Sequence, residues 1–563
     1  MFFIHKKPPR SHALGEPLLH ENHARPRTRR EFIGAGLLSG PAVVMAPAWL
    51  GALLKAQRAN AGSLDPDIDA LRALAECNVP SAGNGLPFIC FDLAGGANLV
   101  GSEVIVGQSG GQSNFLTTAG YGLLGVPGNM VPSSSANIDK SLGLWWHADG
   151  AIKRGIMSVI QPTTALGVNG AVICAMSQND TQTNPHNPMY GIAMAKRTGQ
   201  LLTLIGTDSS VSGGNSMAPM ELIDPTLQPT VIAQPSDATA LVPMPPGGSG
   251  TPDPLAVATL ESQTRISGGS ATGGSCTTGN LAGCYQNGAG GTGAFTGALS
   301  TANGATPGVS LYPASDPTQA TDDPRLKNQV RCAYVKAANT ANVFGSPSAL
   351  DPTQDPIIQA IVKSTGLTFS DSDVKKTASV MKLVLNGFAG AGTITMGGYD
   401  YHDGTRATGE TRNFKAGQMI GMVLQYAAQV QPTPTPVMIY VFSDGSLNAN
   451  SMVDNSAAGR GKLGWQGDNS SVASTFFLAY SPKGRPTLRP GANQQIGYFT
   501  PDGNVVSTSS PAANSVDSLV YTLLLNYMGL SGSDALFAST FPMQTLGGSG
   551  QLTPLTVFQP IYP

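Results

Sequence analysis

Short apolar runs, each bounded by polar or glycine-rich residues, recur along this chain from residue 86 onward. Four of them have the length of strands, at 86–93, 170–176, 392–396 and 436–442. Near-continuous apolar runs of this length are typical of parallel strands, because helices cover both faces of a parallel sheet. A further short strand is predicted at 103–106.

Segments with helical spacing lie between and after these runs. Within 410–430 the apolar positions have the spacing of one helix face. They are Phe414, Met419, Ile420, Val423 and Leu424. A second helix is predicted at 515–528. The repeated order of strand, polar loop and helix indicates an α/β fold with a doubly wound, mostly parallel sheet. In such a fold, ligands bind at the carboxyl ends of the strands.

One segment interrupts this pattern. Residues 236–325 are rich in Gly, Ser, Thr, Ala and Pro, carry few charges and contain few large apolar side chains. The segment is too long to be an ordinary connection. We interpret it as an irregular insertion into one domain, because the runs before and after it resemble parts of one sheet. A flexible linker between two domains is the alternative.

The first 61 residues have the layout of an export signal. The pair Arg29-Arg30 is followed by a weakly apolar run at 34–54 and then by Ala59-Asn60-Ala61. A charged region, an apolar region and a small-x-small cleavage site in this order indicate a twin-arginine signal peptide. The run is also long enough for a membrane anchor, but glycines and prolines interrupt it. We therefore expect a mature protein of residues 62–563, without a membrane span, in the periplasm or at the cell surface.

The charge balance of the mature protein bears on its partners. The leader holds nine of the 32 basic and three of the 34 acidic residues, which leaves 23 against 31 and a formal charge of −8. An acidic protein without a basic stripe argues against a nucleic-acid partner. The sequence leaves a small molecule and an envelope polymer open as ligands, and it does not indicate an oligomeric state.

The six cysteines do not have the spacing of a structural zinc site. Cys276 and Cys284 lie in the 236–325 segment, where no core would bury them. In an oxidising compartment we expect them to form a local disulfide. Cys90 and Cys174 lie in apolar runs and are expected to be buried free thiols.

Two candidate sites follow predicted strands. After 392–396 comes Gly398-Tyr399-Asp400-Tyr401-His402-Asp403, in which alternation places Asp400 and His402 on one side and the tyrosines on the other. A carboxylate and an imidazole so placed suit a divalent metal ion or an acid/base pair; a polar turn is the alternative. Asp444 follows 436–442, where α/β enzymes keep ligands, although an aspartate before glycine also suits a turn.

A third candidate is the loop around His186. Asn187 and Pro188 suit the N-cap and first position of a helix running toward Lys196. Free backbone N–H groups at the start of that helix could bind an anion near His186. A histidine held by a local hydrogen bond in the loop is the alternative.

A weaker candidate is Ser109, the centre of a G-x-S-x-G pattern at 107–111. A serine hydrolase also needs an acid and then a histidine in order, and no convincing pair follows. The chain has no Walker loop, no H-E-x-x-H motif and no convincing dinucleotide fingerprint.

Five motifs, taken in order, resemble a large bacterial family of exported proteins with a domain of unknown function. They are the twin-arginine leader, Gly95-Gly96-Ala97-Asn98, Asn184-Pro185-His186, Gly397-Gly398-Tyr399-Asp400-Tyr401-His402 and Val441-Phe442-Ser443-Asp444. The resemblance covers about 86–545 without the 236–325 segment, and Gly397 to His402 is its most specific part. That family is placed in the alkaline phosphatase/sulfatase superfamily. The resemblance implies an α/β/α sandwich and, in the active members of the superfamily, a two-metal phosphoesterase site.

The sequence departs from that family at several positions. Asn98 stands where an aspartate is usual, and Pro185-His186 stands where a Ser-His pair is expected. The nucleophile would then have to come from a neighbouring hydroxyl, and we assign it to Thr183 beside His186, with Ser177 and Thr181 as alternatives. The late tryptophan block, 462–465, has lost its acid and imidazole.

The remaining residues favour a reduced metal site. Asp400, His402 and Asp444 can hold one divalent ion but hardly two. Two functions stay open: an exported metal-dependent hydrolase of phosphate or sulfate esters, or a non-catalytic binding or assembly protein of the cell envelope.

Overall fold

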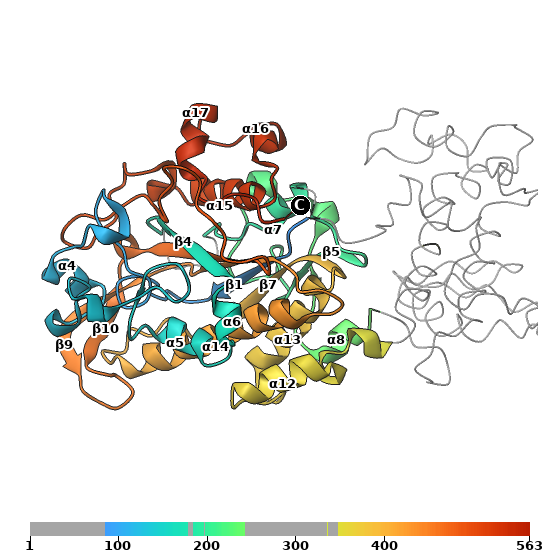
Figure 1. Cartoon of the computed structure of the whole chain (residues 1–563), viewed down its shortest axis with the longest axis horizontal. Coiled ribbons are helices and arrows are strands. Elements are labelled where there is room, and N and C mark those ends of the chain that lie inside the picture. The colour runs from blue at the N-terminus through green and yellow to red at the C-terminus, as the bar shows by residue number, and fades with distance from the viewer. Residues whose placement is uncertain (1–84, 178–183, 196, 242–334, 336–346, 563) are drawn as a thin grey trace, which may run out of the picture. The chain divides into compact units, whose positions relative to one another are not determined.

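An eight-stranded sheet organises the part of the chain that the structure, a computed structural model, describes: residues 85–177, 184–195, 197–241, 335 and 347–562 (Figure 1). Its strands, in spatial order, are β12 (Gln495–Ile496), β4 (Val168–Cys174), β11 (Ser474–Tyr480), β8 (Val437–Phe442), β1 (Phe88–Leu93), β7 (Ala389–Met396), β5 (Leu202–Gly206) and β6 (Thr230–Val231). The described residues lie in one compact unit, Leu64–Pro563. Four features predicted from the sequence lie outside them: the export signal, Thr183, the disulfide of Cys276 and Cys284, and most of the 236–325 segment.

The sheet is mostly parallel, as the apolar runs predict. β1 lies at its centre, with β7 on one side and β8 on the other, both parallel to it. β11 is the exception, because it runs antiparallel to both β8 and β4. Strands from before and after the 236–325 segment therefore share one sheet, as expected.

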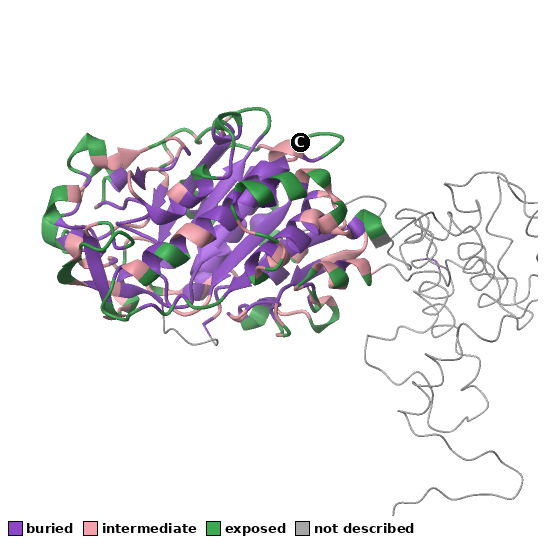
Figure 2. Cartoon of the chain, turned by 90° about the horizontal axis from the view of Figure 1, so that it is seen from below, coloured by how far each residue is buried: buried purple, intermediate pink, exposed green. Residues whose placement is uncertain are grey.

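Helices cover both faces of the sheet (Figure 1). One face packs against α5 (Ala151–Met157), α12 (Pro356–Ser364), α13 (Ser372–Leu385) and α14 (Ala407–Gln429). The other face packs against α7 (Met189–Met194) and α15 (Val516–Leu530). The strands are buried between these layers (Figure 2), which explains their near-continuous apolar sequences.

The long helix α14 contains the predicted apolar stripe and crosses α5 closely. At the crossing, a side chain on Gly155 would collide with the backbone of Phe414, and one on Gly417 would collide with the backbone of Ile152. Two glycines therefore allow the helices to approach backbone to backbone. This contact holds the amino-terminal part of α14 against the rest of the fold. The helix begins just after residues 397–406, the Asp400 turn.

Two local predictions were wrong. Residues 103–106 form no strand of the large sheet: Val104 makes only isolated bridges to Val100 and Trp146, because these apolar side chains cover the core from a loop. The helix predicted to run toward Lys196 is present as Met189–Met194, but its N-cap is Pro188, one residue later than predicted.

Other local predictions were confirmed. Asn187 Oδ1 still accepts a hydrogen bond from the Met189 N–H, at 3.1 Å. Cys90 and Cys174 are buried free thiols. A separate finding concerns membranes: among the described residues, no helix has both the length and the apolar character needed to cross one.

Candidate functional site

The carboxyl ends of the parallel strands meet around Gly95, in the loop after β1. Gly95 has a φ of 135°, and a side chain there would collide with the backbone nitrogen of Asp400 after β7. Its own N–H donates to Asp444 Oδ1 after β8, at 2.9 Å. Because only glycine permits this conformation and this close approach, Gly95 brings the loops of three neighbouring strands together.

Asp400 and His402 lie side by side at this edge, as predicted. Their side chains are exposed, whereas Tyr399 and Tyr401 are buried, so the alternation expected from the sequence is confirmed. His402 Nε2 lies 2.7 Å from Asp400 Oδ1.

Asp468 completes the group, although no sequence motif points to it. It is the last residue of β10 (Lys462–Asp468), which pairs with β9 (Leu447–Asp454) in a small antiparallel sheet. Asp468 Oδ1 lies 4.0 Å from His402 Nε2, and the ligand atoms of Asp400, His402 and Asp468 all lie within 4.8 Å of one another. This group could hold a metal ion. Its third member owes its position to the β9–β10 pairing, which no local motif indicates.

Asp444, the third ligand expected from the sequence, is not part of this group. It is buried, and its oxygens accept hydrogen bonds that join three loops. Oδ1 accepts from Gly95 N–H, and Oδ2 accepts from Asn215 Nδ2 at 3.1 Å. Its backbone carbonyl accepts from Asn184 Nδ2 at 2.6 Å. Asp444 therefore organises the loops around the exposed group.

A second buried carboxylate, Asp92, lies at the end of the central strand β1 and was also missed. Its Oδ2 accepts from the Ser216 N–H at 2.8 Å, and its Oδ1 accepts from the Ser216 hydroxyl at 3.3 Å. The pKa of Asp92 is raised to about 7: burial is the main cause, Asp444 also raises the pKa, and the hydrogen bonds from Ser216 lower it. A lone aspartate within an apolar strand was the available signal for this residue.

His186 lies in a buried position beside β8. Its ring stacks on Phe442 with 5.7 Å between centroids, and neither ring nitrogen has a hydrogen-bond partner among the described residues. Burial lowers the pKa of His186 to about 3, so the imidazole is neutral throughout the physiological range. Thr183, assigned as its nucleophilic neighbour, lies outside the described residues. Ser109, the weaker candidate, is exposed on a loop.

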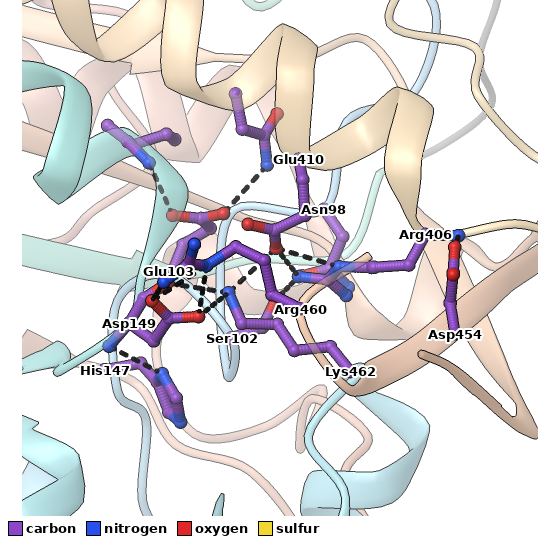
Figure 3. A network of polar contacts seen from close by, with 12 residues as sticks. Asn98, Ser102, Glu103, His147, Asp149, Arg406, Glu410, Asp454, Arg460 and Lys462 are labelled. Carbon is purple, nitrogen blue, oxygen red and sulfur yellow. Dashed lines mark hydrogen bonds and ion pairs between the residues drawn. The ribbon is translucent and has the colours of Figure 1, made fainter. Parts of the chain in front are cut away.

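A buried ionic network surrounds Glu410 of α14 (Figure 3). Glu410 of α14 accepts from three cations: Arg406 and Lys462, both fully buried, and Arg154. Burial alone would raise the pKa of Glu410, but Arg406 and Lys462 hold it below its ordinary value. Arg460 pairs with Asp149 at the margin of the network, at 2.6 Å.

A cavity of about 440 Å³ lies at the opposite, amino edge of the sheet. Its lining includes Pro87 just before β1, Gly387 just before β7 and Pro436 just before β8. It is thus separated from the Asp400 group by the length of the strands.

No protein-family model, curated protein or solved structure matches this chain.

Proposed function

We propose that the protein binds one divalent metal ion through Asp400, His402 and Asp468 and is a metal-dependent hydrolase of phosphate or sulfate esters. The convergence of these three ligand atoms within 4.8 Å carries the proposal. Two carboxylates and one imidazole are a common ligand set for divalent ions, with positions left open for water or substrate. A bound ion would lower the pKa of a coordinated water and so supply a nucleophile.

The electrostatics of this edge favour a cation. Asp400 and Asp468 are exposed there, and the buried Asp444 holds the neighbouring Gly95 loop. These carboxylates attract a divalent ion and oppose a phosphate dianion that arrives without one. Asp92, whose pKa is raised to about 7, adds negative charge only as the pH rises through that value. The metal ion is therefore the element that permits an anionic ester to approach.

The neighbouring carboxylates favour one ion over two. Both oxygens of Asp444 already accept from Gly95 and Asn215, and both oxygens of Asp92 accept from Ser216. Each carboxylate is oriented by these donors toward the loops that it holds. We propose a reduced member of the alkaline phosphatase/sulfatase superfamily, exported by the twin-arginine pathway; the three-layer fold and the order of the motifs support this assignment.

One observation favours a second function, a non-catalytic binding or assembly protein of the cell envelope. His186 is buried against Phe442 and stays neutral, so it is poorly placed to exchange protons with a substrate at the exposed group. A protein that only binds would keep the metal ion and lack turnover.

The experiment measures metal binding and hydrolysis on the same samples. Purified protein of residues 62–563 is titrated with Mn²⁺ and Zn²⁺ by calorimetry, and turnover of p-nitrophenyl phosphate and sulfate is then followed with and without metal. We expect one ion per chain, and we expect His402→Ala to abolish binding. Asp403→Asn is the matched control, because Asp403 is an exposed neighbour whose carboxylate accepts only from Thr405 and Thr408 in the described hydrogen bonds.

The outcomes separate the candidates. Metal binding together with metal-dependent turnover, both lost in His402→Ala and kept in Asp403→Asn, supports the hydrolase. Metal binding without turnover of either ester favours the binding protein. Wild-type protein that binds neither ion rules out the metal site.

A further inference from the structure

Tyr401 lies between the two exposed ligands Asp400 and His402, but its side chain points into the interior. It is fully buried, and its hydroxyl donates to Asn413 Oδ1 of α14 at 3.1 Å. The same hydroxyl accepts from the Asn98 N–H in the loop after β1, at 3.2 Å. One side chain thus ties the backbone between both ligands to a helix and to the loop after the central strand.

The orientation of Asn413 is itself determined by a buried carboxylate. Asn413 Nδ2 donates to Glu103 Oε1 at 3.0 Å, and Glu103 Oε2 accepts from the Ile152 N–H at 2.8 Å. Burial and the neighbouring Glu410 raise the pKa of Glu103. Both of its oxygens nevertheless accept here, so the Asn413 amide presents its nitrogen to Glu103 and its oxygen to Tyr401.

The third ligand is tied to the same region. Gly404 N–H donates to the Trp465 carbonyl of β10 at 2.9 Å, and Trp465 N–H donates to the Thr405 carbonyl at 3.0 Å. At the other end of β10, the buried Lys462 donates to Glu410 at 2.8 Å (Figure 3). The strand that ends in Asp468 is therefore held against both the turn and α14.

The three ligand side chains are largely in contact with solvent. Their exposed fractions are 53% for Asp400, 41% for His402 and 52% for Asp468. Holding exposed groups around one ion costs conformational entropy unless the backbone beneath them is already ordered. Tyr401 is the residue between Asp400 and His402. Among the described residues, the contacts of its buried side chain order the backbone at this point.

We propose that Tyr401, Asn413 and Glu103 are positioning residues that set the metal affinity of the Asp400, His402 and Asp468 site. This inference rests on the proposed metal site and adds the determinant of its affinity. Groups that orient metal ligands from behind typically change metal affinity by about 10–100-fold when they are removed.

The test compares two tyrosine variants of the protein of residues 62–563. Tyr401→Phe removes the hydroxyl that joins Asn98 and Asn413. Tyr527→Phe is the matched control: Tyr527 is equally buried and donates to the Leu86 carbonyl at 2.9 Å, at the amino edge of the sheet. Co²⁺ affinity, the visible absorption of the bound Co²⁺ and the melting temperature are measured for each protein.

We expect Tyr401→Phe to weaken Co²⁺ binding at least about 10-fold and to alter the Co²⁺ spectrum. We expect Tyr527→Phe to lower the melting temperature by a similar amount without changing either metal readout. Asn413→Ala removes the acceptor of the Tyr401 hydroxyl while leaving the Tyr401 ring in place, and it should reproduce the loss of affinity if Tyr401→Phe does not fold.

Unchanged affinity and spectrum in Tyr401→Phe or Asn413→Ala, with wild-type protein binding Co²⁺, would overturn the positioning role and leave the metal site standing. Equal loss of affinity in Tyr527→Phe would also overturn it, since the effect would then follow general stability. Wild-type protein that binds no metal overturns the proposed site and this inference with it.

Discussion

Replacing Asp92 by asparagine should make the protein more tolerant of neutral and alkaline pH. Asp92 is fully buried, and its pKa rises from 3.8 to about 7 on folding, mainly because burial disfavours the charged form. Between those two values the folded protein keeps the proton that the unfolded chain has lost. The free energy of unfolding therefore falls as pH rises through this window.

The magnitude follows from the size of the shift. A change from 3.8 to about 7 is roughly three pKa units, and each unit corresponds to about 1.4 kcal/mol. The contribution of Asp92 is fully present below pH 3.8, and up to about 4 kcal/mol of it is lost by pH 7. In Asp92→Asn the new amide oxygen would still accept from the Ser216 N–H and the side chain would carry no charge, so this loss disappears in the variant.

The assay is urea unfolding of wild-type protein and Asp92→Asn from pH 5 to pH 8.5. All other titrating groups are common to both proteins, so the difference between their free energies of unfolding isolates Asp92. We expect that difference to move in favour of the variant by about 1.4 kcal/mol per pH unit up to pH 7 and to level off above it.

Asp355→Asn is the control for this measurement. Burial alone would raise the pKa of Asp355, but Lys382 and Tyr426 hold it below its ordinary value. The stability that Asp355 contributes is therefore present above its unfolded pKa and is lost only in acid, outside the window. A difference between wild type and Asp92→Asn that stays constant from pH 5 to pH 8.5 would refute the reasoning.

Three further predictions concern the buried network, the centre of the site and export. Lys462→Met should lower the free energy of unfolding by about 3 kcal/mol in urea unfolding, because Glu410 loses one of its buried cations; a neutral effect would show that the two arginines suffice. Gly95→Ala should lower the free energy of unfolding by more than about 2 kcal/mol and abolish Mn²⁺ binding in calorimetry, because the added methyl group would collide with the Asp400 backbone. Wild-type Mn²⁺ affinity in this variant would contradict the close approach. Changing Arg29 and Arg30 to lysine should leave an uncleaved precursor in the cytoplasm, visible by fractionation and immunoblotting, and normal export would argue against the twin-arginine signal.

Local patterns in the sequence were sufficient for the main elements of the fold. The apolar runs predicted β1, β4, β7 and β8 to within a few residues, and the helical stripe predicted α14. The residues of an apolar run are enough to predict that a strand is buried on both faces, without knowing which strands lie beside it. β11 was missed although Ser474–Tyr480 is equally apolar, and its antiparallel place between β4 and β8 is a pairing that no single segment specifies.

At the candidate site, too, local patterns were sufficient for some residues and long-range contacts decided the others. Strand alternation alone placed Asp400 and His402 on one side, because side-chain direction along an extended segment is a local property. Local sequence could not show that Asp468, and not Asp444, is their neighbour. Asp468 ends β10, and Asp444 follows β8 by two residues. Only the β9–β10 pairing brings Asp468 to His402, while the donors Gly95 and Asn215 hold Asp444 in the interior. The sequence by itself thus determined which chemical groups were available, and the tertiary structure decided which of them meet, because their distances depend on contacts between residues far apart in the chain.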